Sequence, residues 1–139
     1  MCMKKVVLLC FIHLLCFSVS GQSARYNEAK GYIRDKGYSI SAEQYADLSQ
    51  GAEAGYTKTF YEGLSYIIIA MSDDADVTDV DVYLRYPSGT AYDKDADSDR
   101  LAVIHFTPTY TREMRVVVKN YASNTPNYKS KCRILIGAK

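Results

Sequence analysis

The stretch Asp-Val-Asp-Val-Tyr-Leu-Arg-Tyr-Pro-Ser-Gly, residues 79–89, alternates polar and apolar side chains before it reaches a turn. Successive side chains of an extended strand point to opposite faces. The apolar face carries Val80, Val82, Leu84 and Tyr86, and the polar face carries Asp79, Asp81, Tyr83 and Arg85. Proline presets φ and glycine accepts the last position of a tight turn, so Pro87–Gly89 should end the strand. The stretch therefore predicts a strand with one buried face.

Outward from this strand, the chain after residue 54 keeps the same period. Strand patterns bounded by turn residues occur at Tyr56–Tyr61, Leu64–Met71, Thr90–Tyr92, Leu101–Phe106, Met114–Asn120 and Lys131–Ile136. Short strands joined by turns are typical of an all-β protein in which two sheets pack face to face. We therefore predict an antiparallel β-sandwich of about seven strands over residues 55–139.

The preceding residues, 22–54, predict a helical N-terminal segment. Ser23–Lys36 has apolar residues at helical spacings, and Gly37 suits a helix C-cap. Ser41–Gln44 has the form of a capping box, so a short second helix could begin there and end at Leu48. An extended segment at a sheet edge explains the same residues equally well, and the sequence leaves both interpretations open.

Residues 1–21 have the pattern of a secretory signal peptide. Two lysines precede the apolar run Val6–Phe17, which is too short to span a bilayer. The small residues Ser18–Gly21 follow and suit signal peptidase. Lipoprotein processing at Cys16 is less favoured, because leucines stand where a small residue is expected. We expect a secreted or periplasmic protein with no stable membrane insertion after cleavage.

Net charge and cysteine count argue against a nucleic-acid partner and against an intramolecular disulfide. The chain has a formal net charge of +1, and it stays near neutral without the lysines of the signal peptide. Such a balance argues against nucleic acid as a partner. After residue 21 the only cysteine is Cys132, so no intramolecular disulfide can form. Its alternation with Ile134 and Ile136 predicts a position in the core.

The sequence does not indicate catalysis. After residue 21 the only histidine is His105, inside an apolar strand pattern, and no Gly-x-Ser-x-Gly nucleophile motif occurs. One histidine and one cysteine are a poor ligand set for zinc. A hydrolase that uses a pair of aspartates is a further hypothesis, but no pair stands out. We therefore expect no enzymatic activity.

Aspartates are concentrated in one part of the chain. Residues 73–99 contain nine of them, in and around two loops that flank a predicted hairpin. Packed carboxylates repel unless a cation lies between them, and Ca²⁺ takes about six to eight oxygen ligands. The candidate calcium ligands are Asp73, Asp74, Asp76, Asp79, Asp93, Asp95, Asp97 and Asp99. The alternative is solvated turn residues, with Asp79 and Asp81 bonded to backbone N–H groups of the neighbouring loop or paired with Arg115 or Lys119 across the sheet.

Tyrosine is abundant, with 13 residues and no tryptophan. Exposed tyrosines near strand ends can stack on sugars or anchor a protein partner. Basic residues late in the chain could add a cationic face for an acidic partner. The candidate partner-binding residues are Tyr83, Tyr92, Tyr110, Arg115 and Lys119. The alternative is ordinary packing on a sheet surface, for which tyrosine has a high propensity.

Short motifs within Gly55–Gly137 resemble the bacterial prepeptidase C-terminal (PPC) domain family. The matching pieces are Tyr61–Tyr66 at a hairpin end, Asp79–Leu84 with its Pro87–Gly89 turn, and Phe106–Pro108 before Met114–Val118. The resemblance implies a jelly-roll-like β-sandwich in an exported, non-catalytic accessory role. It also implies a link to secretion, substrate contact or calcium binding.

Together, these patterns predict a secreted, non-enzymatic β-sandwich that serves as a binding or accessory module. Calcium is its candidate cofactor, and an envelope protein or a glycan is its candidate partner. The alternative is a structural or stress-related envelope protein without a dedicated ligand.

Overall fold

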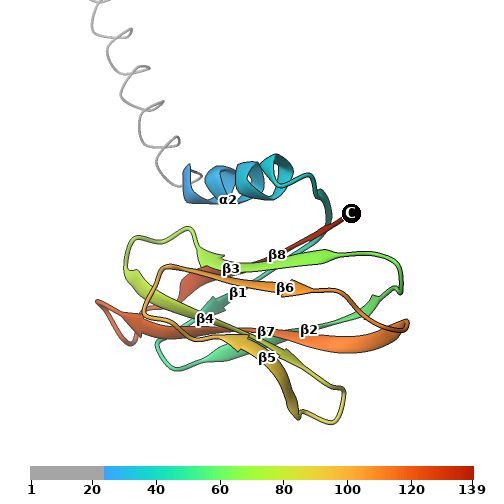
Figure 1. Ribbon diagram of the computed structural model, residues 1–139. Coiled ribbons are helices and arrows are strands. Elements are labelled where there is room, and N and C mark those ends of the chain that lie inside the picture. Colours follow the sequence, from blue (N-terminus) through green and yellow to red (C-terminus); the bar gives the residue numbers. More distant parts are fainter. Residues whose placement is uncertain (1–23) are drawn as a thin grey trace, which may run out of the picture.

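The computed structural model describes residues 24–139, which form two antiparallel four-stranded sheets packed face to face (Figure 1). Sheet A has the spatial order β1 (Ser39–Leu48), β8 (Ser130–Ala138), β3 (Tyr66–Ser72) and β6 (Leu101–Phe106). Sheet B has the order β2 (Glu53–Phe60), β7 (Arg112–Ser123), β4 (Val77–Arg85) and β5 (Ala91–Asp95). Two packed four-stranded sheets, eight strands in all, are the architecture of a jelly roll. The predicted all-β sandwich is confirmed.

Strand β4, which contains most of the stretch that predicted the fold, contributes to the core between the sheets. Val80, Val82 and Leu84 of β4 are fully buried. They belong to the same packed cluster as Ile68 of β3 and Ile136 of β8 in the opposite sheet. Burying one such side chain stabilises the fold by about 1.5–3 kcal/mol. The alternation in residues 79–86 thus fixes which face of β4 points inward.

The N-terminal segment is only partly helical: the prediction of a helical segment over residues 22–54 holds for α2 (Ala24–Asp35) alone, and of the two interpretations of residues 41–48 the edge strand is the correct one. Helix α2 is present as expected, and Gly37, with φ of 84°, follows it. Residues 39–48, however, form strand β1, which pairs with β8 along its whole length. Pairing with a neighbouring strand satisfies every second backbone group of this segment, and this outweighs the local capping signal. The predicted signal peptide, residues 1–21, lies outside the described residues.

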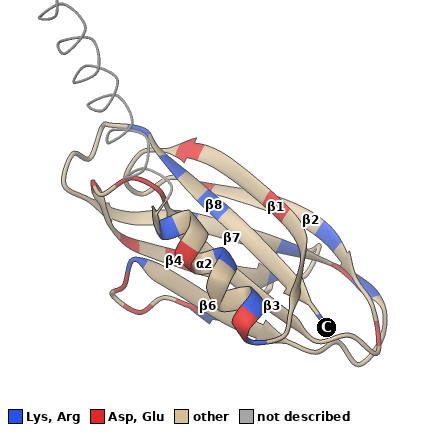
Figure 2. Ribbon diagram, turned by 90° about the horizontal axis from the view of Figure 1, so that it is seen from above, with Lys and Arg blue, Asp and Glu red and all other residues tan. Residues whose placement is uncertain are grey.

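Helix α2 covers the outer face of sheet A (Figures 1 and 2). Its buried residues Ala29 and Ile33 pack against apolar side chains of β3 and β8: Ile67, Ile69, Met71 and Leu135. Gly137 permits this close approach, because a Cβ there would lie 2.6 Å from Cγ2 of Ile33. No helix within residues 24–139 is long and apolar enough to cross a membrane.

Cys132 of β8 is fully buried, as predicted from its alternation with two isoleucines. Burial raises the pKa of its thiol to about 11, although the side chain of Ser72 opposes the shift. The thiolate is the reactive form of cysteine, so this thiol is unreactive near neutral pH.

Candidate functional site

The topology separates the connecting loops into two groups at opposite ends of the sandwich (Figure 1). One group contains residues 61–65, 86–90 and 107–111, and we call it the aromatic end. The other contains residues 49–52, 73–76, 96–100 and 124–129, and we call it the acidic end. The two ends carry different chemistry, although the same strands lead to both.

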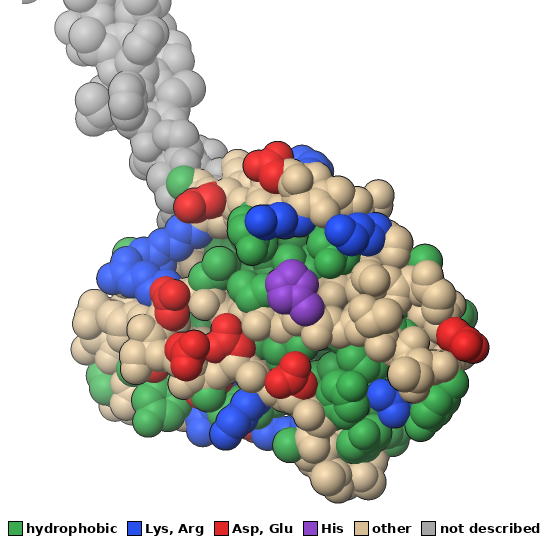
Figure 3. Space-filling view, in the orientation of Figure 1, with side chains coloured by type: hydrophobic (Ala, Val, Ile, Leu, Met, Phe, Trp, Pro, Cys, Tyr) green, Lys and Arg blue, Asp and Glu red, His purple; other side chains and the backbone are tan. Residues whose placement is uncertain are grey.

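Four aromatic rings surround the guanidinium group of Arg112 at the aromatic end. Its Cζ lies 4.8 Å from the ring centroid of Tyr110, 5.2 Å from Tyr92, 5.4 Å from Tyr86 and 5.5 Å from Phe106. The rings also contact one another edge to face, with centroids of Tyr86 and Tyr92 5.6 Å apart. Figure 3 shows hydrophobic side chains gathered at this end around a basic one. We call these five residues the aromatic cluster.

A buried layer holds the aromatic cluster in place. Phe60, at the end of β2, contacts the rings of Tyr66 and Phe106 edge to face, at centroid distances of 4.8 and 5.3 Å. The hydroxyl of Tyr66 accepts a hydrogen bond from the backbone N–H of Tyr61 at 2.9 Å. A further bond, from the N–H of Glu62 to Thr111 Oγ1 at 3.0 Å, ties two loops together. The cluster therefore rests on the core.

The outer part of the cluster is open to solvent. Tyr92 is 45% exposed and Tyr110 is 55% exposed, whereas Phe106 lies beneath them at 3%. Arg112 donates a hydrogen bond from Nη1 to the hydroxyl of Tyr110 at 3.1 Å, and its Nε is buried without a partner. None of the ion pairs found in residues 24–139 involves Arg112. The site thus offers exposed rings, a hydroxyl and an arginine that no carboxylate neutralises.

At the acidic end, the aspartates of the first loop bond to other parts of the protein. Asp73 forms an ion pair with Arg133, with 2.7 Å between Oδ2 and Nη2. Asp76 accepts hydrogen bonds from the N–H and the Oγ1 of Thr125 at 3.2 and 2.9 Å. Asp74 accepts one from the N–H of Asp76 at 2.9 Å. These carboxylates fix loops 73–76 and 124–129 to each other and to β8.

The remaining candidate ligands are also spread over separate contacts. Asp79 accepts a hydrogen bond from the N–H of Asp99 at 3.3 Å, and Asp95 accepts one from the N–H of Val103 at 2.9 Å. Asp93 and Asp95 accept the N–H groups of Lys94 and Asp97, respectively, within the same strand and turn. Among residues 24–139, no group of three or more His, Cys, Asp or Glu side chains is placed to hold a metal ion. Calcium binding at these aspartates stays a prediction.

Two acidic side chains of β4 are unusual because they are buried. Asp81 is 2% exposed and Asp79 is 8% exposed. Burial raises the pKa of both carboxyls, and the negative charge of Asp79 raises the pKa of Asp81 further. The hydroxyl of Tyr83 donates to Asp81 Oδ2 at 3.2 Å and opposes the shift. Asp81 therefore forms its hydrogen bond with Tyr83. The predicted ion pair with Arg115 or Lys119 is not among the ion pairs found in residues 24–139, and Lys119 only lowers the pKa of Asp81 through its nearby charge.

The predicted partner-binding residues divide between two surfaces. Tyr92 and Tyr110 belong to the aromatic cluster, whereas Tyr83, Arg115 and Lys119 lie on the outer face of sheet B. On that face, Arg115 lies across Gly55, where any Cβ would meet its guanidinium. The ring of Tyr83 contacts the guanidinium of Arg85 at 4.9 Å. Arg115 and Tyr83 thus already contact neighbouring residues of the same sheet.

Sequence reasoning did not assign Tyr86 or Phe106 to a site, and it counted Arg112 only among the late basic residues of a cationic face. Each falls at the end or the beginning of a strand, where its pattern indicates only a strand boundary. They lie in or beside two loops, 86–90 and 107–111, which are separated in the sequence by strands β5 and β6. The one available signal was the recurrence of aromatic residues at three of these strand ends, at positions 60–61, 86 and 106.

Comparison with known proteins identifies relatives by fold alone. No protein-family model matches the sequence, and no curated protein matches it significantly. The pre-peptidase C-terminal domain of a Bacillus anthracis collagenase aligns with 70% of this chain and 89% of its own, with a TM-score of 0.52 and 11% identity. The Yersinia pseudotuberculosis-derived mitogen aligns with 72% of this chain and 86% of its own, with a TM-score of 0.50 and 14% identity.

A third solved structure, the periplasmic inhibitor of g-type lysozyme from Aeromonas hydrophila, covers 75% of this chain and 90% of its own. Its TM-score is 0.48 and its identity is 13%. The collagenase domain is of the kind that the motifs in Gly55–Gly137 predicted. The chain therefore has a PPC-like β-sandwich fold.

Proposed function

We propose that this protein is an extracytoplasmic, non-enzymatic binding module that holds a glycan at its aromatic end. The observation that supports this most strongly is the arrangement of Tyr92 and Tyr110 around Arg112, which holds two exposed rings in fixed positions. The apolar run and small residues before residue 22, which predict a signal peptide, support a location outside the cytoplasm.

A sugar ring has an apolar face of C–H groups and an edge of hydroxyls. A tyrosine matches both, because its ring is apolar and its hydroxyl is a hydrogen-bond donor and acceptor. Arg112 adds donors that no carboxylate occupies within the described residues. The exposed hydroxyls of Ser88 and Thr90 lie in the adjoining turn, 3.2 Å apart. The surface therefore offers apolar faces and groups that can bind hydroxyls.

Pre-organisation favours binding at this end. Side chains that are ordered only upon binding each cost about 0.5–1.5 kcal/mol. Here the rings of Tyr86, Tyr92 and Phe106 already contact one another, and Arg112 contacts all three. A ligand would therefore meet a surface whose ordering cost was met during folding.

Affinity electrophoresis tests the proposal. Wild-type protein would be run through gels that contain a β-glucan, a mannan, a xylan or a digest of peptidoglycan. Retardation in at least one gel is expected, with at least a tenfold loss of affinity in Tyr92→Ala and in Tyr110→Ala. Tyr128→Ala is the matched control, because Tyr128 is also 55% exposed but lies at the acidic end.

Either of two outcomes would contradict the proposal. Wild-type protein that no glycan retards would favour the alternative, an envelope protein without a dedicated ligand. Equal losses in Tyr110→Ala and Tyr128→Ala would show that exposed tyrosines act without regard to their place in the fold.

A further inference from the structure

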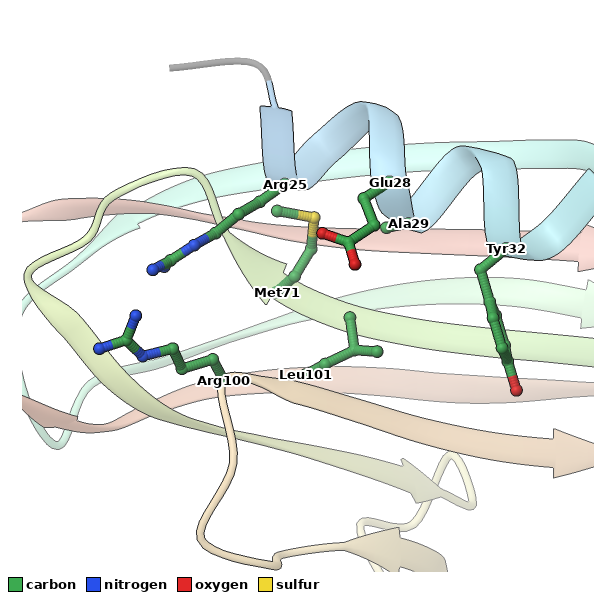
Figure 4. Close-up of a pocket in the computed structure, with 7 residues that line it drawn as sticks. All are labelled: Arg25, Glu28, Ala29, Tyr32, Met71, Arg100 and Leu101. Carbon is green, nitrogen blue, oxygen red and sulfur yellow. The ribbon is translucent and has the colours of Figure 1, made fainter. Parts of the chain in front are cut away.

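A second open surface lies between helix α2 and the edge strand β6, on the outer side of sheet A. The structure has a pocket of about 300 Å³ there, lined by Arg25, Glu28, Ala29, Tyr32, Met71, Arg100 and Leu101 (Figure 4). Figure 3 shows hydrophobic side chains gathered below the helix. The pocket exists because α2 packs over β3 and β8 and leaves the outer face of β6 uncovered.

The middle of this pocket is apolar. Met71 and Ala29 are buried at 2% and 3% exposure, and they form its floor. Leu101 and Tyr32 are 36% and 39% exposed, and they form its two sides. Ligand pockets are typically lined by apolar side chains with a few polar groups at fixed places. The pocket therefore suits an apolar side chain of modest size.

One end of the pocket is cationic. The guanidinium groups of Arg25 and Arg100 point toward the same region in Figure 4. None of the ion pairs found in residues 24–139 involves either of them. Arg25 is held by a hydrogen bond from Nη1 to the backbone carbonyl of Asp74 at 3.3 Å. The nearest sequence neighbour of Arg100, Asp99, accepts the backbone N–H of Arg100 at 2.6 Å and not its guanidinium.

Within its described residues, the first turn of α2 contains Arg25 and no acidic residue. A bound anion would relieve the repulsion between Arg25 and Arg100. Arginine pairs are also well suited to chelate a carboxylate.

Glu28 distinguishes between possible anions. Its carboxylate lies on the pocket wall between the arginines and Tyr32 (Figure 4), where it would repel a purely aliphatic acid that offers no donor. The last residue of a peptide offers all three required groups, namely a carboxylate, an apolar side chain and a backbone N–H that can donate to Glu28. We propose that this pocket binds the C-terminal carboxylate of a peptide or protein whose last residue is apolar.

The proposal concerns a surface separate from the aromatic cluster, so either site can fail its test without the other. The probe is the tetrapeptide acetyl-Ala-Ala-Leu-Leu with a free carboxylate, and its C-terminal amide is the matched control. Binding to the protein that begins at residue 22 would be measured by calorimetry and by shifts of backbone amide resonances. The free acid should bind at least tenfold more tightly than the amide, with shifts at the pocket residues.

Arg100→Gln should remove the preference of the protein for the acid over the amide. Arg34→Gln is the control, because Arg34 is exposed on the same helix but does not line the pocket. Equal binding of acid and amide by the wild type, or no binding of either, would overturn the proposal. So would a preference that persists in Arg100→Gln, or octanoate that binds as tightly as the peptide acid.

Discussion

The aromatic end and the acidic end of this sandwich use their most abundant residue types in opposite ways. At the aromatic end, rings in and beside two loops, 86–90 and 107–111, converge on Arg112 and leave two tyrosines exposed together. At the acidic end, the aspartates separate: Asp73 bonds to a guanidinium, Asp76 to the N–H and hydroxyl of Thr125, and Asp74 and Asp79 to backbone N–H groups. A high local density of one residue type therefore indicates a site only when folding brings the side chains together.

The physical reason lies in the side chains. Aspartate is short and accepts hydrogen bonds from nearby backbone N–H groups, so it serves local turn structure. Tyrosine and phenylalanine are large, and they gain most by packing against other rings. In loops rich in aspartate, each side chain can thus find its own hydrogen-bond partner nearby. Aromatic residues at strand ends instead pack against rings from other loops.

The largest effect is expected from Phe60→Ala, which removes the buried ring beneath the aromatic cluster. Phe60 is fully buried and contacts Tyr66 and Phe106. Replacing such a phenylalanine by alanine costs about 3–5 kcal/mol of unfolding free energy. Urea denaturation would measure the loss, and a change below about 1 kcal/mol would show that the core does not support this end.

An intermediate effect is expected from Asn120→Ala, which removes a buried amide near the acidic end. Asn120 Nδ2 donates to the carbonyl of Leu48 at 3.0 Å, and its Oδ1 accepts from Ser123 Oγ at 2.8 Å. Leaving these partners unsatisfied should cost about 1–3 kcal/mol. Asn124→Ala, at an exposed site in the adjoining loop, is the control and should change stability little. Equal effects in the two variants would mean that burial of the amide is not what matters.

A small stabilisation is expected from Asp81→Asn at neutral pH. The folded-state pKa of Asp81 is raised above its ordinary 3.8 by burial and by the charge of Asp79. A carboxyl with a raised pKa contributes stability below its unfolded pKa and loses that contribution as pH rises through its folded pKa. The variant should therefore unfold at a higher temperature at pH 7, by an amount worth at most about 1 kcal/mol.

The same comparison repeated at acid pH checks the sign of this effect. Below pH 3.8 the carboxyl is protonated in both states, so the advantage of Asp81→Asn should vanish. A variant that is less stable than the wild type at pH 7 would show that the charged carboxylate stabilises the fold.

The smallest effect is expected from calcium. Asp73, Asp74, Asp76 and Asp79 already bond to protein groups, so excess Ca²⁺ should give the same melting temperature as chelator. A site filled at a hundredfold excess over its Kd would instead add about 2.7 kcal/mol, which is several degrees for a domain of this size. A calcium-specific rise of that kind would establish the metal site that the sequence predicts, and Mg²⁺ is the control ion.

Most of the fold could be predicted from the sequence, because strand alternation in residues 79–86 and elsewhere directly reflects burial. The exception was β1, residues 39–48, whose strand character depends on β8, about 90 residues further along the chain. Its local residues also fit a capping box, and no local signal separates the two outcomes.

The candidate sites were predictable only in part. Tyr92 and Tyr110 were correctly grouped as exposed tyrosines, but Arg112 and Tyr86 could not be placed beside them without the topology. The pocket beside α2 was not predictable, because it forms only where Arg25 of the helix and Arg100 at the sheet edge line the same cavity. Which residues share a cavity depends on packing, and a pattern along the sequence does not indicate it.

The central claim is that ligand recognition resides at the aromatic end, and mapping the bound glycan on the protein tests it most directly. Uniformly ¹⁵N-labelled protein would be titrated with the glycan that retards it most strongly, and backbone amide shifts followed residue by residue. The account predicts the largest shifts in residues 86–92 and 106–112, with little change in residues 73–76 and 96–100. Shifts concentrated in the acidic loops, or no shifts at saturating glycan, would contradict it.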